Sequence, residues 1–201
     1  MTRSLLLASA SPRRRELLER VGLPLEVRPA NVDETARPSE APDAYVMRIA
    51  RSKAGAVSRR ADDWVLAADT TVTIDRTILG KAETPEEATT MLRLLSGRTH
   101  QVLTGFVVIG VREGKPVIRE SVVASDVVMI DLDDALLADY VASNEWRGKA
   151  GAYAIQGIGA ALVREVRGSV TNVIGLPLVE VLAALRDAGG PQPRLATGIP
   201  A

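Results

Sequence analysis

The sequence contains no cysteine, a single histidine, no excess of charge of either sign and no long apolar run. The absence of cysteine excludes disulfides, zinc–thiolate sites and cysteine nucleophiles. A Ser-His-Asp triad would have to use His100, and no G-x-S-x-G motif accompanies it. Lysine plus arginine and aspartate plus glutamate number 25 each, so the charge balance gives no reason to expect nucleic acid as the main partner.

Neither a signal peptide nor a membrane span is expected, because no apolar segment has the necessary length. We therefore expect a cytoplasmic protein that does not bind a membrane. Hydrophobic residues make up 46% of the 201 positions, which is enough for a folded core. We expect one domain over residues 1–188, in which two small lobes can share a core. Residues 189–201 are rich in glycine and proline, which predicts a flexible tail.

Apolar periodicity and turn signals indicate an α/β protein. They predict strands over residues 5–8, 25–28, 64–68, 71–75, 77–79, 101–112, 117–130 and 160–166. They predict helices over residues 12–21, 42–60, 85–95, 132–143 and 174–185. Helices and strands alternate early, whereas the middle of the chain is a run of hairpins. This order favours a long mixed sheet flanked by helices over a regularly alternating parallel sheet.

The segment from Ser9 to Arg15 joins the end of the first strand to the first helix. Pro12 suits the first helical position, which makes Ser11 the expected N-cap. Three consecutive arginines then follow at a helix N-terminus, where backbone N–H groups are free. Such a segment is suited to hold phosphate oxygens. It is equally typical of an ordinary capped helix with a solvated basic end.

Several charged residues occupy positions where the pattern is otherwise apolar. Lys53 lies on the apolar stripe of the second helix, so it either snorkels past the rim of the core or points into a cleft. A methionine there should fill the same space at little cost in stability. Arg14 lies on the apolar face of the first helix, whereas Arg15 is spaced to pair with Glu19 on the solvent side. Asp69 directly follows a buried strand, where it either caps a turn or needs a cation, a metal or N–H partners.

Glu34 follows the second predicted strand, and Lys81 follows the predicted hairpin. Together with Arg14, Lys53 and Asp69 they place three cations and two carboxylates near the ends of elements. Mg²⁺ binds through one or two carboxylates plus phosphate oxygens more readily than in an all-protein cage. The set therefore indicates a divalent metal together with a polyphosphate. No Walker A loop is present.

Taken together, these segments resemble the Maf family of nucleoside triphosphate pyrophosphatases. The resemblance extends from residue 4 to about residue 187, with the motifs in the family's order. The matching segments are SASPRR (9–14), VDE (32–34), RSKA (51–54), AADT (67–70), GK (80–81), SGRTH (96–100), KAGAYAIQG (149–157) and GSVTNVIGLPL (168–178). One departure is Ala82, which stands where the family usually has proline.

The resemblance implies hydrolysis of modified or surplus nucleotides to the monophosphate and pyrophosphate. It implies a fold like that of inosine triphosphate pyrophosphatases, with a cleft between two lobes. Arg13, Thr70 and Gln156 match positions that the family associates with substrate choice. They resemble the branch that acts on dTTP and UTP, with modified pyrimidine nucleotides as further candidates. The branch that acts on 7-methyl-GTP differs around the Gln156 position. A nucleotide-binding regulator of septum formation is the alternative to an enzyme.

On this basis we expect Asp69 to act as general base and to contact Mg²⁺ or Mn²⁺, with Glu34 as a second metal ligand. The expected charge-neutralising residues are Arg14, Lys53 and Lys81. Ser9 and Ser11 would add neutral donors to the substrate, and the Gln156 amide offers a donor and an acceptor to the base. The sequence leaves open the physiological nucleotide, the preferred metal and whether the chain forms a homodimer.

Overall fold

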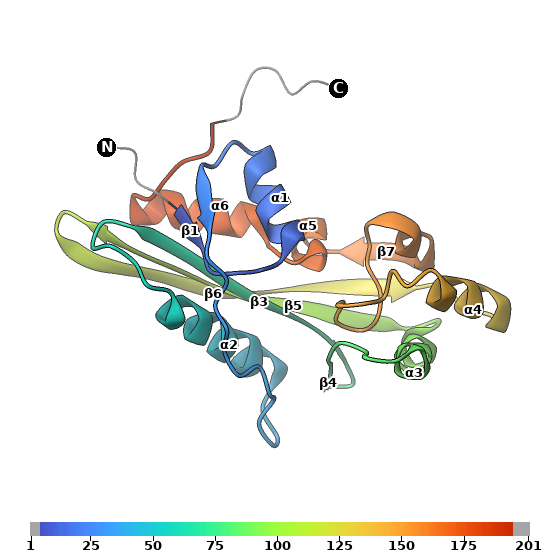
Figure 1. Cartoon of the computed structure of the whole chain (residues 1–201). Helices are drawn as coiled ribbons and strands as arrows, with labels where there is room; N and C mark the ends of the chain where they lie inside the picture. The colour runs from blue at the N-terminus through green and yellow to red at the C-terminus, as the bar shows by residue number, and fades with distance from the viewer. Residues whose placement is uncertain (1–4, 195–201) are drawn as a thin grey trace.

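The computed structural model describes residues 5–194, which form one seven-stranded mixed sheet with helices on both faces (Figure 1). The strands are β1 (Leu5–Leu7), β2 (Leu25–Val27), β3 (Trp64–Ile74), β4 (Thr77–Leu79), β5 (Thr99–Arg112), β6 (Lys115–Met129) and β7 (Val163–Arg167). The helices are α1 (Pro12–Arg20), α2 (Pro42–Ala56), α3 (Pro85–Leu95), α4 (Asp134–Ala142), α5 (Val170–Ile174) and α6 (Leu178–Ala188), with a 3₁₀ helix, η1 (Gly157–Leu162). The predicted mixed sheet with flanking helices is confirmed.

The strand order is β2-β1-β3-β5-β6-β7, with β4 paired to β3. Strand β1 runs parallel to both of its neighbours, and the other pairs are antiparallel. The register of β3 and β5 places Asp69 opposite Gly105 and Thr70 opposite Thr104. The middle of β3 therefore carries its polar residues at the centre of the sheet.

The two faces of the sheet have separate cores. Helix α2 packs on one face, against Leu6 and Val65, and helices α1 and α6 pack on the other, against Leu5 and Leu66 (Figure 1). A third core lies beyond the middle of β3 and contains α3, α4 and Trp146. The polar segment Asp69–Thr71 thus separates Ala68, in one of the first two cores, from Val72 in the third.

Gly105 allows α2 to lie close to the sheet. A Cβ atom at this position would approach the backbone of Val46 and Met47 to 2.8 Å. Real Cβ atoms do not come so close to backbone, so a larger residue would push α2 away. The close approach brings the last turns of α2, and with them Lys53, directly over β3.

Helix α3 has the first and last residues that the sequence predicts. Thr84 caps it by accepting a hydrogen bond from the Glu87 amide, at 3.2 Å, and Pro85 occupies the first turn. Helix α1 also begins at Pro12, but the Ser11 side chain makes no capping bond. Instead the Ser11 amide donates to Ser9 Oγ at 3.2 Å.

Three predicted elements begin at a later residue in the structure than the sequence predicts. The helix predicted over 174–185 begins at Leu178, because Gly175 adopts a φ of 130° and Pro177 follows it. The strand predicted from residue 160 begins at Val163, because residues 157–162 form the 3₁₀ helix η1. The helix predicted from residue 132 begins at Asp134 and is capped by Asp133, with the Leu136 amide donating to the Asp133 carboxylate at 2.8 Å.

The prediction that a strand ends at residue 68 is also wrong. Strand β3 continues without interruption for 11 residues, so Asp69 lies inside it and does not cap a turn. The β-branched residues Thr71 and Thr73 favour extended backbone, and β5 pairs with this whole stretch. Helix α2, in turn, ends at Ala56 instead of near residue 60. Helix α6 ends at Ala188, three residues beyond the predicted end, and the remaining predicted boundaries agree to within two residues.

The C-terminal segment predicted as a tail lies partly outside the described residues. Within the described part, the Gly190 amide donates to Leu185 O at 2.8 Å and the Arg194 amide donates to Gly22 O at 3.3 Å. Residues 189–194 are therefore hydrogen-bonded to the domain. None of the helices described here is long and apolar enough to cross a membrane.

Candidate functional site

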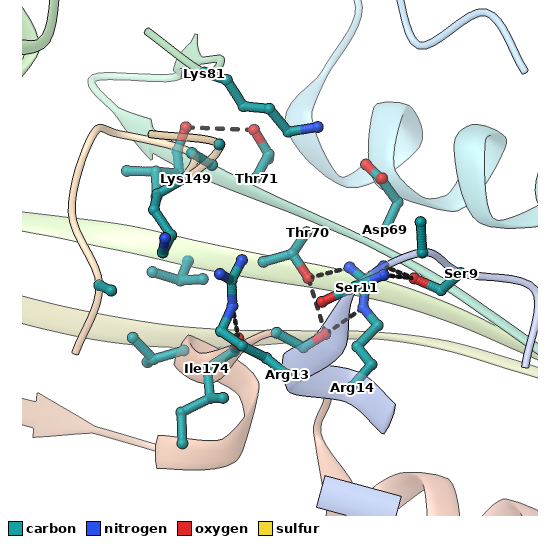
Figure 2. Close-up of a pocket in the computed structure, with 18 of the residues that line it drawn as sticks. Ser9, Ser11, Arg13, Arg14, Asp69, Thr70, Thr71, Lys81, Lys149 and Ile174 are labelled. Carbon is teal, nitrogen blue, oxygen red and sulfur yellow. Dashed lines mark hydrogen bonds between the residues drawn. The ribbon is translucent and has the colours of Figure 1, made fainter. Parts of the chain in front are cut away.

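A cavity of about 540 Å³ lies beside the middle of β3, where the cores of the sheet meet (Figure 2). Its walls come from the loop between β1 and α1, the loop before α2, the middle of β3, the segment after β4, residues 148–156 and the end of α5. All ten residues singled out from the sequence line it: Ser9, Ser11, Arg13, Arg14, Glu34, Lys53, Asp69, Thr70, Lys81 and Gln156. Segments far apart in the chain therefore converge on this cavity.

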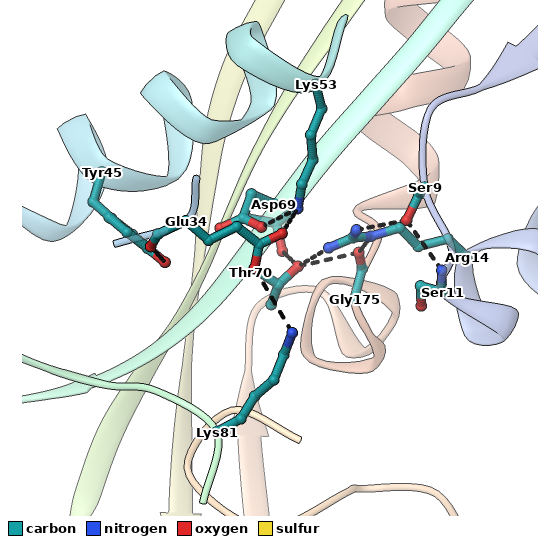
Figure 3. Close-up of polar contacts among 11 residues, drawn as sticks. Ser9, Ser11, Arg14, Glu34, Tyr45, Lys53, Asp69, Thr70, Lys81 and Gly175 are labelled. Carbon is teal, nitrogen blue, oxygen red and sulfur yellow. Dashed lines mark hydrogen bonds and ion pairs between the residues drawn. The ribbon is translucent and has the colours of Figure 1, made fainter. Parts of the chain in front are cut away.

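Lys53 joins the two carboxylates of the cavity (Figure 3). Its Nζ lies 2.7 Å from Asp69 Oδ1 and 2.6 Å from Glu34 Oε1. Lys81 Nζ lies 3.7 Å from the other oxygen of Glu34. Lys53 and Asp69 are 7% and 6% exposed. Lys53 therefore points into the cleft and does not snorkel past the rim of the core, the other alternative that the sequence left open.

The electrostatic surroundings keep Glu34 ionised. Burial alone would raise the pKa of Glu34, but the hydrogen bond and charge of Lys53, together with the charges of Lys81 and Arg14, hold the pKa below its usual value. Tyr45 supports the same segment, because its hydroxyl donates to Glu34 O at 2.9 Å. Burial, aided by the charges of Asp69 and Glu34, raises the pKa of Tyr45 to about 12.

Arg14 is buried and held on three sides. Its Nε donates to Gly175 O at 2.7 Å, Nη1 to Ser9 Oγ at 2.9 Å and Nη2 to Thr70 Oγ1 at 2.9 Å (Figure 3). Burial lowers the pKa of Arg14, and the charge of Asp69 partly offsets this. Arg15, in contrast, is exposed and pairs with Glu19 at 2.7 Å, as predicted. The interpretation of this segment as a solvated basic helix end is therefore wrong for Arg14.

Arg13 and Lys149 form a second cationic group in the cavity (Figure 2). Arg13 Nε donates to Ile174 O at 3.2 Å, and Lys149 Nζ donates to Arg147 O at 3.1 Å. Neither has a carboxylate partner among residues 5–194. Burial and the charge of Arg13 lower the pKa of Lys149, and burial lowers the pKa of Arg13. The charge of Glu145 partly offsets the lowering of the pKa of Lys149. This end of the cavity therefore carries two cations that form no salt bridge within the described part of the chain.

The remaining predicted residues differ in how they are placed. Ser9 is buried and bonded to Arg14, whereas Ser11 is half-buried with its side chain at the cavity wall. Gln156 is half-buried on the segment that also carries Lys149. The Thr70 hydroxyl contacts protein groups: it donates to Gly175 O at 3.2 Å and lies 2.8 Å from Thr104 Oγ1.

Sequence reasoning missed three residues of the site. Lys149 was available as the first residue of the 149–157 motif, and Tyr45 lies eight residues before Lys53 on the same helix. Thr104 is a single hydroxyl within an apolar strand pattern, and it is fully buried in the structure. Its position was a usable signal, because a buried hydroxyl needs a partner.

The donor set fits a divalent ion only if the substrate completes its coordination. Within residues 5–194, no group of three or more His, Asp or Glu residues is arranged to hold a metal. Glu34 and Asp69 approach each other closely enough to share Lys53 Nζ. Two such carboxylates plus phosphate oxygens match the way Mg²⁺ binds in nucleotide-dependent enzymes.

A family model described as "Maf-like protein" matches residues 4–188. The chain belongs to the Maf family. A relative from Anaeromyxobacter dehalogenans (strain 2CP-C), named "dTTP/UTP pyrophosphatase", is 52% identical over 193 residues, covering 96% of this chain and 98% of the relative. Relatives of the same name from Myxococcus xanthus and Syntrophus aciditrophicus are 50% and 47% identical over 190 residues. The former alignment covers 94% of both chains, and the latter 94% of this chain and 92% of the relative.

The predicted resemblance to the Maf family is thus confirmed over nearly the whole chain. Among solved structures, "Structure of a HAM1 protein from Coxiella burnetii" superimposes with a TM-score of 0.47 and 18% identity. That superposition covers 93% of this Maf protein and 100% of the other chain.

Proposed function

We propose that this Maf protein hydrolyses dTTP and UTP to the nucleoside monophosphate and pyrophosphate. The observation that carries the proposal is the near-complete alignment, at 52% identity, with a relative named dTTP/UTP pyrophosphatase. The cavity supports it, because it brings five cations and two carboxylates to one place. A triphosphate needs such charge compensation when it leaves water.

In the proposed reaction, water attacks the α-phosphorus. A bond forms between the water oxygen and the α-phosphorus, and the bond from the α-phosphorus to the bridging oxygen of the β-phosphate breaks. Asp69 accepts the proton of the water. Lys53 holds Asp69 Oδ1 at 2.7 Å, and no other side chain described here hydrogen-bonds this carboxylate, so Oδ2 is available for the proton. Pyrophosphate leaves with the electron pair of the broken bond.

The cations neutralise the charge that develops on the phosphate oxygens. Arg14 is fixed in place by three hydrogen bonds, while Lys81 is exposed enough to move onto the substrate. Preorganised charge of this kind usually contributes most to catalysis. Ser9, Ser11 and the N-terminus of α1 add neutral donors. Glu34 and Asp69 would hold Mg²⁺ or Mn²⁺, which when bound supplies further charge neutralisation at the phosphates.

We assign recognition of the base to Gln156, with Arg13, which also lines the cavity, as a second donor. Uracil and thymine present two carbonyl oxygens and one N–H along the pairing edge. The amide of Gln156 can both donate and accept there. We further propose that residues 1–188 form the catalytic domain, which is supported by the end of α6 at Ala188, and that the enzyme acts in the cytoplasm.

Pyrophosphate, and not orthophosphate, is the expected product from the triphosphate. The purified protein is incubated with Mg²⁺ and a panel of dTTP, UTP, CTP, GTP and 7-methyl-GTP, and both phosphate products are measured. Turnover of dTTP and UTP with pyrophosphate release supports the proposal. Orthophosphate together with a nucleoside diphosphate would overturn the reaction class, and preference for 7-methyl-GTP would overturn the base assignment.

Gln156→Glu is expected to lower kcat/KM for UTP by roughly ten- to a hundredfold, because the carboxylate loses the N–H donor to a base carbonyl. CTP should lose less, since its amino group can donate to the new carboxylate. The ratio of kcat/KM for UTP and CTP is the measurement. Gln192→Glu, which adds the same charge outside the cavity lining, is the control. An unchanged ratio in Gln156→Glu would mean that Gln156 does not read the base.

A further inference from the structure

The hydroxyl of Thr70 lies in the cavity wall but has no hydrogen-bonding capacity left for a substrate. A threonine hydroxyl has one proton and two lone pairs. Arg14 Nη2 donates to Thr70 Oγ1 at 2.9 Å, which uses one lone pair. Thr70 Oγ1 lies 3.2 Å from Gly175 O, and because a carbonyl can only accept, this contact uses the proton.

The third contact of this hydroxyl is Thr104 Oγ1, at 2.8 Å. With the proton of Thr70 directed at Gly175, the second lone pair of Thr70 must accept from Thr104. Thr104 lies directly opposite Thr70 in the pairing of β3 with β5, and it is fully buried. Its other neighbour, Asn172 O, lies farther away at 3.5 Å. All three positions of the Thr70 hydroxyl are therefore filled by protein groups.

The same count for Arg14 gives the opposite result. A guanidinium has five N–H donors, and three are used by Gly175, Ser9 and Thr70. Two remain, one on each terminal nitrogen, which is the number that a bidentate contact to a phosphate needs. Gly175 can present its carbonyl to Arg14 and Thr70 because its φ of 130° is accessible to glycine.

We infer that Thr70 and Thr104 are positioning residues that orient Arg14 for the phosphates, and that Thr70 does not read the base. Thr104 donates to Thr70, which fixes the Thr70 lone pair that receives Arg14. The two free N–H groups of Arg14 are then aimed at phosphate oxygens. This inference rests on the proposed function only in taking a polyphosphate as the ligand.

Binding of inorganic pyrophosphate distinguishes a residue that orients Arg14 from a residue that reads the base, since this ligand has no base. Thr70→Val and Thr104→Val keep the shape of the side chain and remove the hydroxyl. We expect Thr70→Val to weaken pyrophosphate binding, measured by calorimetry, by roughly ten- to thirtyfold, because its lost hydrogen bond is to the charged Arg14 guanidinium. Thr104→Val should weaken binding less, by roughly two- to tenfold, because its lost hydrogen bond is to the neutral Thr70 hydroxyl. The double variant should bind no more weakly than Thr70→Val alone, because Thr104 acts through Thr70. Thr104→Ser, which restores the hydroxyl, should recover most of the loss.

Thr73→Val is the matched control. Thr73 lies on the same strand and is buried, but its hydroxyl has no hydrogen-bond partner. Its removal should leave pyrophosphate binding and kcat/KM unchanged. Thermal melts of all variants show which of them fold, and Thr70→Val, at a half-buried position, gives the comparison if Thr104→Val does not fold.

Two results would overturn the inference. The first is unchanged pyrophosphate affinity in Thr70→Val together with reduced kcat/KM for UTP, which would show that Thr70 reads the base. The second is additive losses in the double variant, which would show that Thr104 acts independently of Thr70. A wild-type protein that binds pyrophosphate but does not turn over UTP would refute the proposed function while leaving this comparison intact.

Discussion

Asp69→Asn is expected to lower kcat by roughly 10²–10⁴-fold, because it removes the proton acceptor that the reaction requires. The amide keeps the shape of the side chain and can still accept a hydrogen bond from Lys53, which also retains Glu34 at 2.6 Å. The fold should therefore persist. Single-turnover and steady-state assays of pyrophosphate release from UTP at saturating Mg²⁺ provide the measurement, with circular dichroism to verify folding.

Asp63→Asn is the matched control for this variant. Asp63 is nearly as buried as Asp69 and lies next to the start of the same strand, but it accepts a hydrogen bond from the Arg60 amide outside the cavity. It should retain activity. Turnover of Asp69→Asn within a few-fold of the wild-type rate would assign Asp69 a structural role.

Lys53→Met is expected to lower kcat/KM by roughly 10²–10³-fold, which is typical for the loss of one preorganised group that stabilises the transition state. The structure changes the expectation for its stability. Methionine fills the space of the lysine stem, but it leaves the buried carboxylate of Asp69 without its partner at 2.7 Å. Breaking a buried pair in this way costs about 3–5 kcal/mol, so we now expect a larger loss of stability than the apolar stripe alone predicts.

The double variant Lys53→Met with Asp69→Asn tests this explanation. It removes the unpaired charge, so its free energy of unfolding in urea should recover most of the loss, while activity stays absent. A double variant that is no more stable than Lys53→Met would show that packing, rather than the unpaired carboxylate, explains the loss.

Elements with strong local signals were predicted closely from the sequence. Helix α3 is set by Thr84, Pro85 and Glu87, all within one turn, and the structure has the predicted bounds. The predicted start of the last helix is wrong, because the apolar pattern runs through residues 174–185 and does not show that Gly175 breaks the helix. A short apolar run does not reveal where a backbone changes direction.

All ten residues predicted for the site line the cavity, but the sequence did not show the contacts that decide between their alternatives. Asp69 was expected at a strand end, since a carboxylate inside a central strand is costly when considered alone. It is tolerated in the middle of β3 because Lys53 reaches it from α2, 16 residues away in sequence. Lys149 and Thr104 were overlooked because their positions become informative only beside Arg13 and Thr70.

The sequence by itself determined the Maf family, the mixed sheet and the set of charged residues, because each motif, apolar stripe and helix cap consists of residues that lie close together along the chain. Only the tertiary structure decided that Lys53 joins Glu34 to Asp69, and that Arg14 is held by Ser9, Thr70 and Gly175. The physical reason is that buried charges and hydroxyls require partners. Those partners come from strands, helices and loops that are brought together by folding and are distant along the chain.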